Sequence, residues 1–417
     1  MNRRVDALDG LRVFALVGIV VFHLFGESGL LTAGGDSFHE RVIWTIFGNT
    51  LDFFFIISGF LLFIPVIRRD GDVGKISTFY LKRFSRLQPE YWACLLVTFM
   101  LIVLVPVSFQ PPVPSAGNVL IHIFDLQTVT RLFDPGFTVG FWINGALWLV
   151  PVIAGLYLVF PLVARSFFRH IWIGLAVAAL ISVCWKLAPD QFPAFFRSLS
   201  DGTASDESVR IIALDQTPAY FFSFAAGMAS AWVYTLARQN AGSPWVRRGV
   251  MAAFVIGIPA YVLVSIPFTH EALLSVTGFD GSSRGRGLAL NSLASTTVRS
   301  VLVLGVILGP LWIQKPFANP FMKWMADRSY GIYLIHLPVI FYLQQLFDLP
   351  QNGTAGDMTL WLVVVLPIVT AYAWASRRLV GEPSIRAVNK WIDSRDSGVS
   401  EAPSRPSEAA KVRYWRR

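Results

Sequence analysis

The sequence is poor in cysteine and in charge, and each shortage excludes a class of protein. Cys94 and Cys184 are its two cysteines, and both lie inside apolar runs. A disulfide framework or a cysteine-rich metal site is therefore excluded. Charged residues make up 15% of the chain, whereas soluble domains carry roughly 25%. A soluble globular protein is therefore not expected.

Long apolar runs separated by short polar segments dominate the chain instead. Hydrophobic residues make up 54% of it, and its mean hydropathy is +0.55. A run of about 20 apolar residues crosses a bilayer as a helix. We therefore predict an all-α polytopic membrane protein, with one transmembrane domain over 1–385 and about ten spans. They lie near 9–27, 45–67, 89–109, 142–164, 170–188, 217–237, 249–268, 297–314, 329–347 and 358–380.

The basic excess, 35 Lys and Arg against 26 Asp and Glu, is a sign of topology. The basic residues cluster between the spans and in the C-terminal segment, not on one soluble face, so no nucleic acid is expected as a partner. Most of them fall on the side that holds both ends of the chain, which the positive-inside rule places in the cytoplasm. The lipid bilayer, as the inner (plasma) membrane of a bacterium, is the expected location. The longer segments 110–141, 189–216 and 269–296 then face outward, where a large acceptor would be met.

The two ends of the chain need separate interpretation. Arg3 and Arg4 precede an apolar run, as in a secretory signal, but Asp6 and Asp9 do not suit a basic leader. We expect the first span to be retained. Residues 386–417 are polar, rich in Pro, Ser and Ala, and basic, which predicts a largely disordered cytoplasmic tail.

Ionisable side chains at membrane depth are costly and are candidates for function. Arg12 and His23 are 11 residues apart, which is about 16 Å along one face of a helix. An arginine at the cytoplasmic mouth suits a phosphate-bearing ligand. Asp52, on the second span, is expected at nearly the depth of His23. A carboxylate there would fix the imidazole tautomer and leave the other nitrogen as a base.

Three other features have both a structural and a functional interpretation. His336, with Tyr333 one turn before it, is either a packed histidine or part of a site. Arg83 and Arg86 share a helix face, and they serve either as a topology anchor or as ligands for a cytosolic polyanion such as coenzyme A. Pro89 is expected in the first turn of the third span.

Five motifs in order resemble the bacterial acyltransferase-3 family of membrane O-acyltransferases. They are LDGLRVFALVGIVVFH, LDFFFIISGFLL, RFSRLQP, SYGIYLIH and Glu382-Pro383, and the match covers most of residues 5 to 385. The resemblance implies an acyl group transferred from acyl-CoA to an extracytoplasmic sugar, glycolipid or other hydroxyl, with no bound cofactor or metal. It implies that His23 is the catalytic base and Arg12 supports the donor. It further implies that substrate contacts come from Arg83, Arg86, Trp148, Tyr330, Tyr333 and His336.

The sequence departs from the family pattern in the fourth span. After Trp148 the family usually has a Ser and, further on, a Glu, where this chain has Leu149 and Ile153. The loss of two polar groups predicts altered specificity or weakened activity. Two other hypotheses stay open: a transporter or exporter of an anionic metabolite, because intramembrane His, Asp and Arg also form ion pathways, and a catalytically impaired relative.

Overall fold

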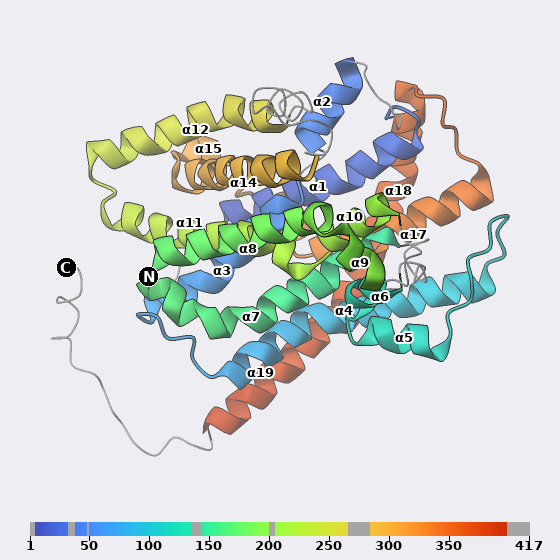
Figure 1. Cartoon of the computed structure of the whole chain (residues 1–417), viewed down its shortest axis with the longest axis horizontal. Helices are drawn as coiled ribbons and strands as arrows, with labels where there is room; N and C mark the ends of the chain where they lie inside the picture. Colours follow the sequence, from blue (N-terminus) through green and yellow to red (C-terminus); the bar gives the residue numbers. More distant parts are fainter. Residues whose placement is uncertain are drawn as a thin grey trace.

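The computed structural model describes residues 5–31, 38–47, 50–134, 144–199, 205–265 and 284–397. Helices lie side by side along the long axis of the molecule (Figure 1). Every regular element within these ranges is a helix. The longer ones are α1 (Ala7–Glu27), α3 (Asp52–Arg68), α4 (Ile76–Leu104), α7 (Leu149–Arg169), α8 (Ile171–Gln191), α11 (Phe221–Gln239), α12 (Pro244–Ser265), α14 (Arg284–Leu308), α17 (Ser329–Phe347), α18 (Ala355–Ser376) and α19 (Glu382–Ser397). The short ones are α2 (Phe38–Phe47), α5 (Ala116–Ile123), α6 (Gln127–Phe133), η1 (Gly145–Trp148), α9 (Pro193–Leu199), α10 (Asp206–Leu214), η2 (Thr217–Tyr220), α15 (Leu311–Gln314), α16 (Pro320–Ala326) and the π-turn η4 (Arg377–Gly381).

The helices confirm an all-α membrane protein. Within the described ranges, nine are long and apolar enough to cross a bilayer. The expected span 217–237 corresponds to α11, which does not meet that measure. Its residues Phe222–Ala231 are all buried, and the helix packs closely on α3. Small residues make this approach possible: a side chain at Gly59 would collide with the carbonyl oxygen of Phe224, and one at Gly227 with that of Ile56.

Two expectations at helix ends are wrong. α4 starts at Ile76, so Pro89 lies inside the helix and not in its first turn. The arginine motif before Pro89 is therefore helical and continuous with the span. The expected disordered tail also begins too early, because α19 extends to Ser397 and packs along α4. The rest of the tail lies outside the described residues.

The predicted outward segment 110–141 is partly folded against α4. The α5–α6 pair turns at Asp125, whose φ of 57° is left-handed. Gln88 donates a hydrogen bond to the Asp125 carboxylate, and Trp92 donates to the carbonyl of Ile123 at 3.1 Å. Gln88 lies 16 residues before Leu104, which is about 24 Å along α4. The turn therefore reaches well along the length of the span.

Candidate functional site

A cavity of about 630 Å³ collects three of the predicted arginines. Arg12 comes from α1, and Arg83 and Arg86 come from α4. Arg377, at the start of η4, is a fourth arginine in the wall. The acidic residues of the lining are Asp9, Glu90 and Asp327. Four guanidinium groups around one cavity make it suitable for a polyanion, because arginine pairs with phosphate oxygens in a bidentate geometry.

Two of these arginines have an N–H donor that no hydrogen bond in the described residues uses. The guanidinium of Arg83 lies over the rings of Phe79 and Tyr157, at 5.7 and 5.9 Å. Within the described part of the chain, its Nε is buried without a hydrogen-bond partner, and so is the Nε of Arg377. Buried donors without a partner are costly and rare. A bound anion would satisfy them.

Arg377 was missed by sequence reasoning, because it lies near the end of the expected span 358–380 and was not singled out there. It donates to Oε1 of the buried Glu90 at 3.3 Å. A side chain at Gly381 would collide with that same oxygen. The π-turn and its glycine therefore bring Arg377 and Glu90 together at the cavity wall. The sequence signal that could have identified Arg377 was a basic residue followed by a glycine at the end of a span.

The end of the cavity that lies deeper in the membrane is more apolar, and two of the predicted tyrosines line the cavity there. Tyr330 donates to the carbonyl of Leu87 at 3.1 Å, and Tyr333 to that of Ala146 at 2.7 Å. Both tyrosines line the cavity, together with Leu149 and Ile153. The two positions that depart from the family pattern thus lie on the wall of the cavity. Trp148 is not part of the lining and packs instead on the ring of Tyr220, at 5.7 Å.

The two predicted histidines lie next to each other, with His336 beside Tyr333, and neither is among the described residues that line the cavity. The rings of His23 and His336 are 5.2 Å apart, and that of Tyr333 lies 5.7 Å from His336. Nδ1 of His23 is 2.8 Å from the carbonyl oxygen of Ile19, and Nδ1 of His336 is 2.6 Å from that of Tyr333. A carbonyl only accepts hydrogen bonds, so each Nδ1 carries the proton and each Nε2 holds a lone pair. Nε2 of His336 is buried and has no hydrogen-bond partner in the described ranges.

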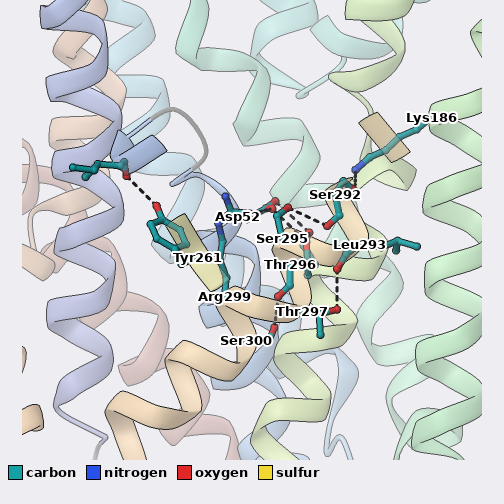
Figure 2. Close-up of polar contacts among 12 residues, drawn as sticks. Asp52, Lys186, Tyr261, Ser292, Leu293, Ser295, Thr296, Thr297, Arg299 and Ser300 are labelled. Carbon is teal, nitrogen blue, oxygen red and sulfur yellow. Dashed lines mark hydrogen bonds and ion pairs between the residues drawn. The ribbon is translucent and has the colours of Figure 1, made fainter. Parts of the chain in front are cut away.

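The expected pairing of Asp52 with His23 is wrong. Asp52 instead accepts from Nη1 of Arg299 at 3.1 Å, from Ser223 at 3.2 Å and from Thr296 at 3.3 Å (Figure 2). Its position at the first residue of α3 directs it to α11 and α14. The tautomer of His23 is fixed by the backbone carbonyl of Ile19 and not by Asp52. Ile19 lies one turn before His23 on the same helix.

Arg299 was also missed, because the expected span began at 297 and left Arg299 at its very edge. The helix α14 in fact begins at Arg284, so Arg299 is well inside it. Ser292, Thr296 and Arg299 recur at helical spacing. That polar stripe indicates that the helix begins well before residue 297.

Comparisons with known proteins agree on one family. A family model described as an acyltransferase domain matches residues 5–378. Peptidoglycan O-acetyltransferase OatA of Listeria monocytogenes is 22% identical over 371 residues, which are 84% of this chain and 51% of that protein. A putative O-acetyltransferase of Staphylococcus aureus is 21% identical over 416 residues, which are 96% of this chain and 60% of that protein. Acyltransferase MdmB of Streptomyces mycarofaciens is 29% identical over 199 residues, which are 46% of this chain and 48% of that protein. The chain thus spans about half to three-fifths of the length of these relatives, and no solved structure matches it.

Proposed function

Because the chain belongs to the acyltransferase-3 family, we propose that it is an O-acyltransferase of the bacterial plasma membrane. It takes an acyl group from cytosolic acyl-CoA and transfers it to a hydroxyl of an extracytoplasmic glycan, glycolipid or related acceptor. The observation that carries the proposal is the convergence of Arg12, Arg83 and Arg86, from two helices, on one cavity.

In this proposal the cavity binds the donor. The arginines hold the phosphates of coenzyme A, and the pantetheine arm extends toward Tyr333. Arg12 and His23 are separated by about 16 Å along α1, a distance that an extended arm can bridge. Phe54 and Tyr333, with ring centroids 6.4 Å apart, both line the inner end of the cavity, and the thioester passes them to reach His23.

His23 supplies the proton chemistry. Its Nε2 lone pair takes the proton of the acceptor hydroxyl as the oxygen attacks the thioester carbonyl. The new carbon–oxygen bond forms, the carbon–sulfur bond breaks, and the imidazolium returns the proton to the departing thiolate. The products are an ester and free coenzyme A. The Nδ1 hydrogen bond to the Ile19 carbonyl supports this role, because it holds the proton on the other nitrogen.

The acceptor is proposed from the relatives. The Listeria monocytogenes protein is named for peptidoglycan O-acetylation, which supports a glycan acceptor for this chain. The short helices α5, α6, α9 and α10 lie in the segments expected on the outer side. Acceptor contacts are expected from this side.

The test is acyl transfer by the purified protein in detergent, followed by CoA release and by mass spectrometry of added envelope glycan. We expect His23→Ala to lower kcat at least about 100-fold, within the range of general-base catalysis. His170→Ala is the matched control, because His170 is exposed between α7 and α8. Equal turnover of wild type and His23→Ala would refute the mechanism. Movement of an anion across liposomes with no covalent product would favour the transporter hypothesis.

A further inference from the structure

The polar cluster around Asp52 contains two cations for one carboxylate (Figure 2). Lys186 of α8 lies at one end and donates to Oγ of Ser292 at 2.5 Å. Arg299 lies two turns further along α14 and donates to Asp52 at 3.1 Å. Thr296 lies between them on the same face and also donates to Asp52. The cluster is therefore a hydroxyl-lined stripe with a cation at each end.

Arg299 uses only part of its guanidinium. The residue is 0% exposed. Nη1 binds Asp52, whereas Nε and Nη2 are both buried and have no hydrogen-bond partner among the residues that the structure describes. Nε and Nη2 form one edge of the group, whose two parallel N–H bonds match the two oxygens of a carboxylate or a phosphate.

Among the described residues, Tyr261 meets this guanidinium only in part. Its ring lies 5.5 Å from Cζ of Arg299, and its hydroxyl, which donates to the carbonyl of Ile46, also comes within hydrogen-bonding reach of the Arg299 side chain. The aromatic face and the neutral hydroxyl stabilise the cation but bring no negative charge to it. A buried charge with unmet donors is strongly unfavourable unless something pairs with it. One further oxyanion would balance the charges of the cluster.

We propose that the Nε and Nη2 edge of Arg299 binds an oxyanion, a carboxylate or phosphate group, carried by the acceptor. Asp52 is the first residue of α3, and the cavity-lining residues Phe54 and Ser58 lie 2 and 6 residues further along that helix. Along α3 the cluster thus begins about 3 to 9 Å beyond these lining residues, toward the side predicted to face outward. The assignment to the acceptor rests on the proposed function, whereas oxyanion binding at Arg299 does not.

Phosphate binding to the full-length protein tests the site. The starting variant is Arg83→Gln/Arg86→Gln, which weakens anion binding in the donor cavity. Inorganic phosphate is titrated while the thermal unfolding midpoint is measured. We expect a saturable rise in Tm, which the further change Arg299→Gln removes. Arg210→Gln is the matched control, since Arg210 forms a similar ion pair with Asp190 at 2.8 Å, and it should leave the rise unchanged.

Asp52→Asn keeps the test decisive if Arg299→Gln fails to fold. Removing a carboxylate 3.1 Å from the guanidinium should tighten phosphate binding several-fold, because Asp52 competes for the same charge. A purely structural ion pair predicts the opposite, a loss of stability with no gain in phosphate affinity. A phosphate response that persists in Arg299→Gln, or that does not strengthen in Asp52→Asn, would overturn the proposal and leave water as the occupant.

Three further probes separate the sources of the oxyanion. Glucuronate against glucose tests a sugar carboxylate, and dihexanoyl phosphatidic acid tests a lipid headgroup. The proposal expects an Arg299-dependent response to glucuronate and none to glucose. A response to the lipid alone would overturn the assignment to the acceptor. If no acceptor is acylated, the proposed function fails, and the phosphate titration still decides whether Arg299 binds an oxyanion.

Discussion

His23 and His336 share one arrangement: each gives its Nδ1 proton to a backbone carbonyl of its own helix and keeps a lone pair on Nε2. Among the described residues, the Nε2 of His336 is buried without a partner, and the rings are 5.2 Å apart. Tyr333, whose ring lies beside that of His336, lines the cavity. In the proposed reaction, one of the two Nε2 atoms takes the acceptor proton and the other positions the hydroxyl that carries it.

We expect His336→Ala to lower kcat about 10- to 100-fold, at the low end of effects on proton transfer. The Kd for CoA should stay within about twofold, because the cavity arginines are untouched. Steady-state kinetics and equilibrium CoA binding on the same preparation measure the two quantities. An unchanged kcat, or a parallel loss of CoA binding, would show that His336 only packs.

Single residues were predictable from the sequence where helical spacing determined them. The spacing of Arg83 and Arg86 and the position of Arg12 placed all three at the same end, and they do line one cavity. Asp52 was assigned to the wrong partner because rise per residue gives depth in the membrane but not the direction in which a side chain points. That direction depends on how α3 packs against α11 and α14.

Among the elements, α3 and α11 make the closest helix contact, through Gly59 and Gly227. We expect Gly59→Ala to destabilise the protein by about 1–3 kcal/mol, because the added methyl would force the helices apart. Gly249→Ala is the control, since nothing lies within 4 Å of a side chain added there. Thermal unfolding in detergent should show a lower Tm for the first variant and not for the second. Equal Tm values would contradict the close packing.

The α5–α6 turn should make stability depend on pH. Burial raises the pKa of Asp125 from 3.8 to about 7, although the hydrogen bond from Gln88 opposes the shift. A raised pKa means that the contribution to stability is complete below about pH 4 and is lost as the pH rises to about 7. We therefore expect Tm to fall between pH 5 and pH 8.

Asp125→Asn should reduce that fall, because asparagine mimics the protonated acid and tolerates the left-handed φ. Asp348→Asn is the matched control, as Asp348 is exposed and also has a left-handed φ of 46°. If Asp125→Asn keeps the full fall, another group causes it.

Elements were predicted well where apolar runs had clear ends and poorly where helices continue beyond the membrane. The expected span 329–347 has the same bounds as α17. In contrast, α4, α14 and α19 extend into polar sequence that was assigned to loops or tail. Hydropathy reports which residues face lipid or core, whereas a helix also continues wherever its polar residues find partners, as Gln88 does with Asp125.

For the whole molecule, the proposed transfer from a cytosolic donor to an extracytoplasmic acceptor requires both termini in the cytoplasm. Cysteines introduced one at a time into a Cys94→Ser/Cys184→Ser background test this orientation. Val113→Cys lies before α5 and Gly242→Cys lies between α11 and α12, both at exposed positions. A membrane-impermeant maleimide should label the first in intact spheroplasts and the second only after permeabilisation. The reverse pattern would place the donor cavity outside and contradict the use of cytosolic acyl-CoA.

CoA binding to the purified protein shows whether the arginine cavity holds the acyl donor. We predict saturable binding that weakens as salt rises and at least about tenfold weaker binding in Arg86→Gln, since one charge-assisted contact is worth about 1.5–3 kcal/mol. Arg210→Gln, which removes a cation from a pair outside the cavity, should bind CoA like the wild type. Equal CoA affinity in all three proteins would contradict the account.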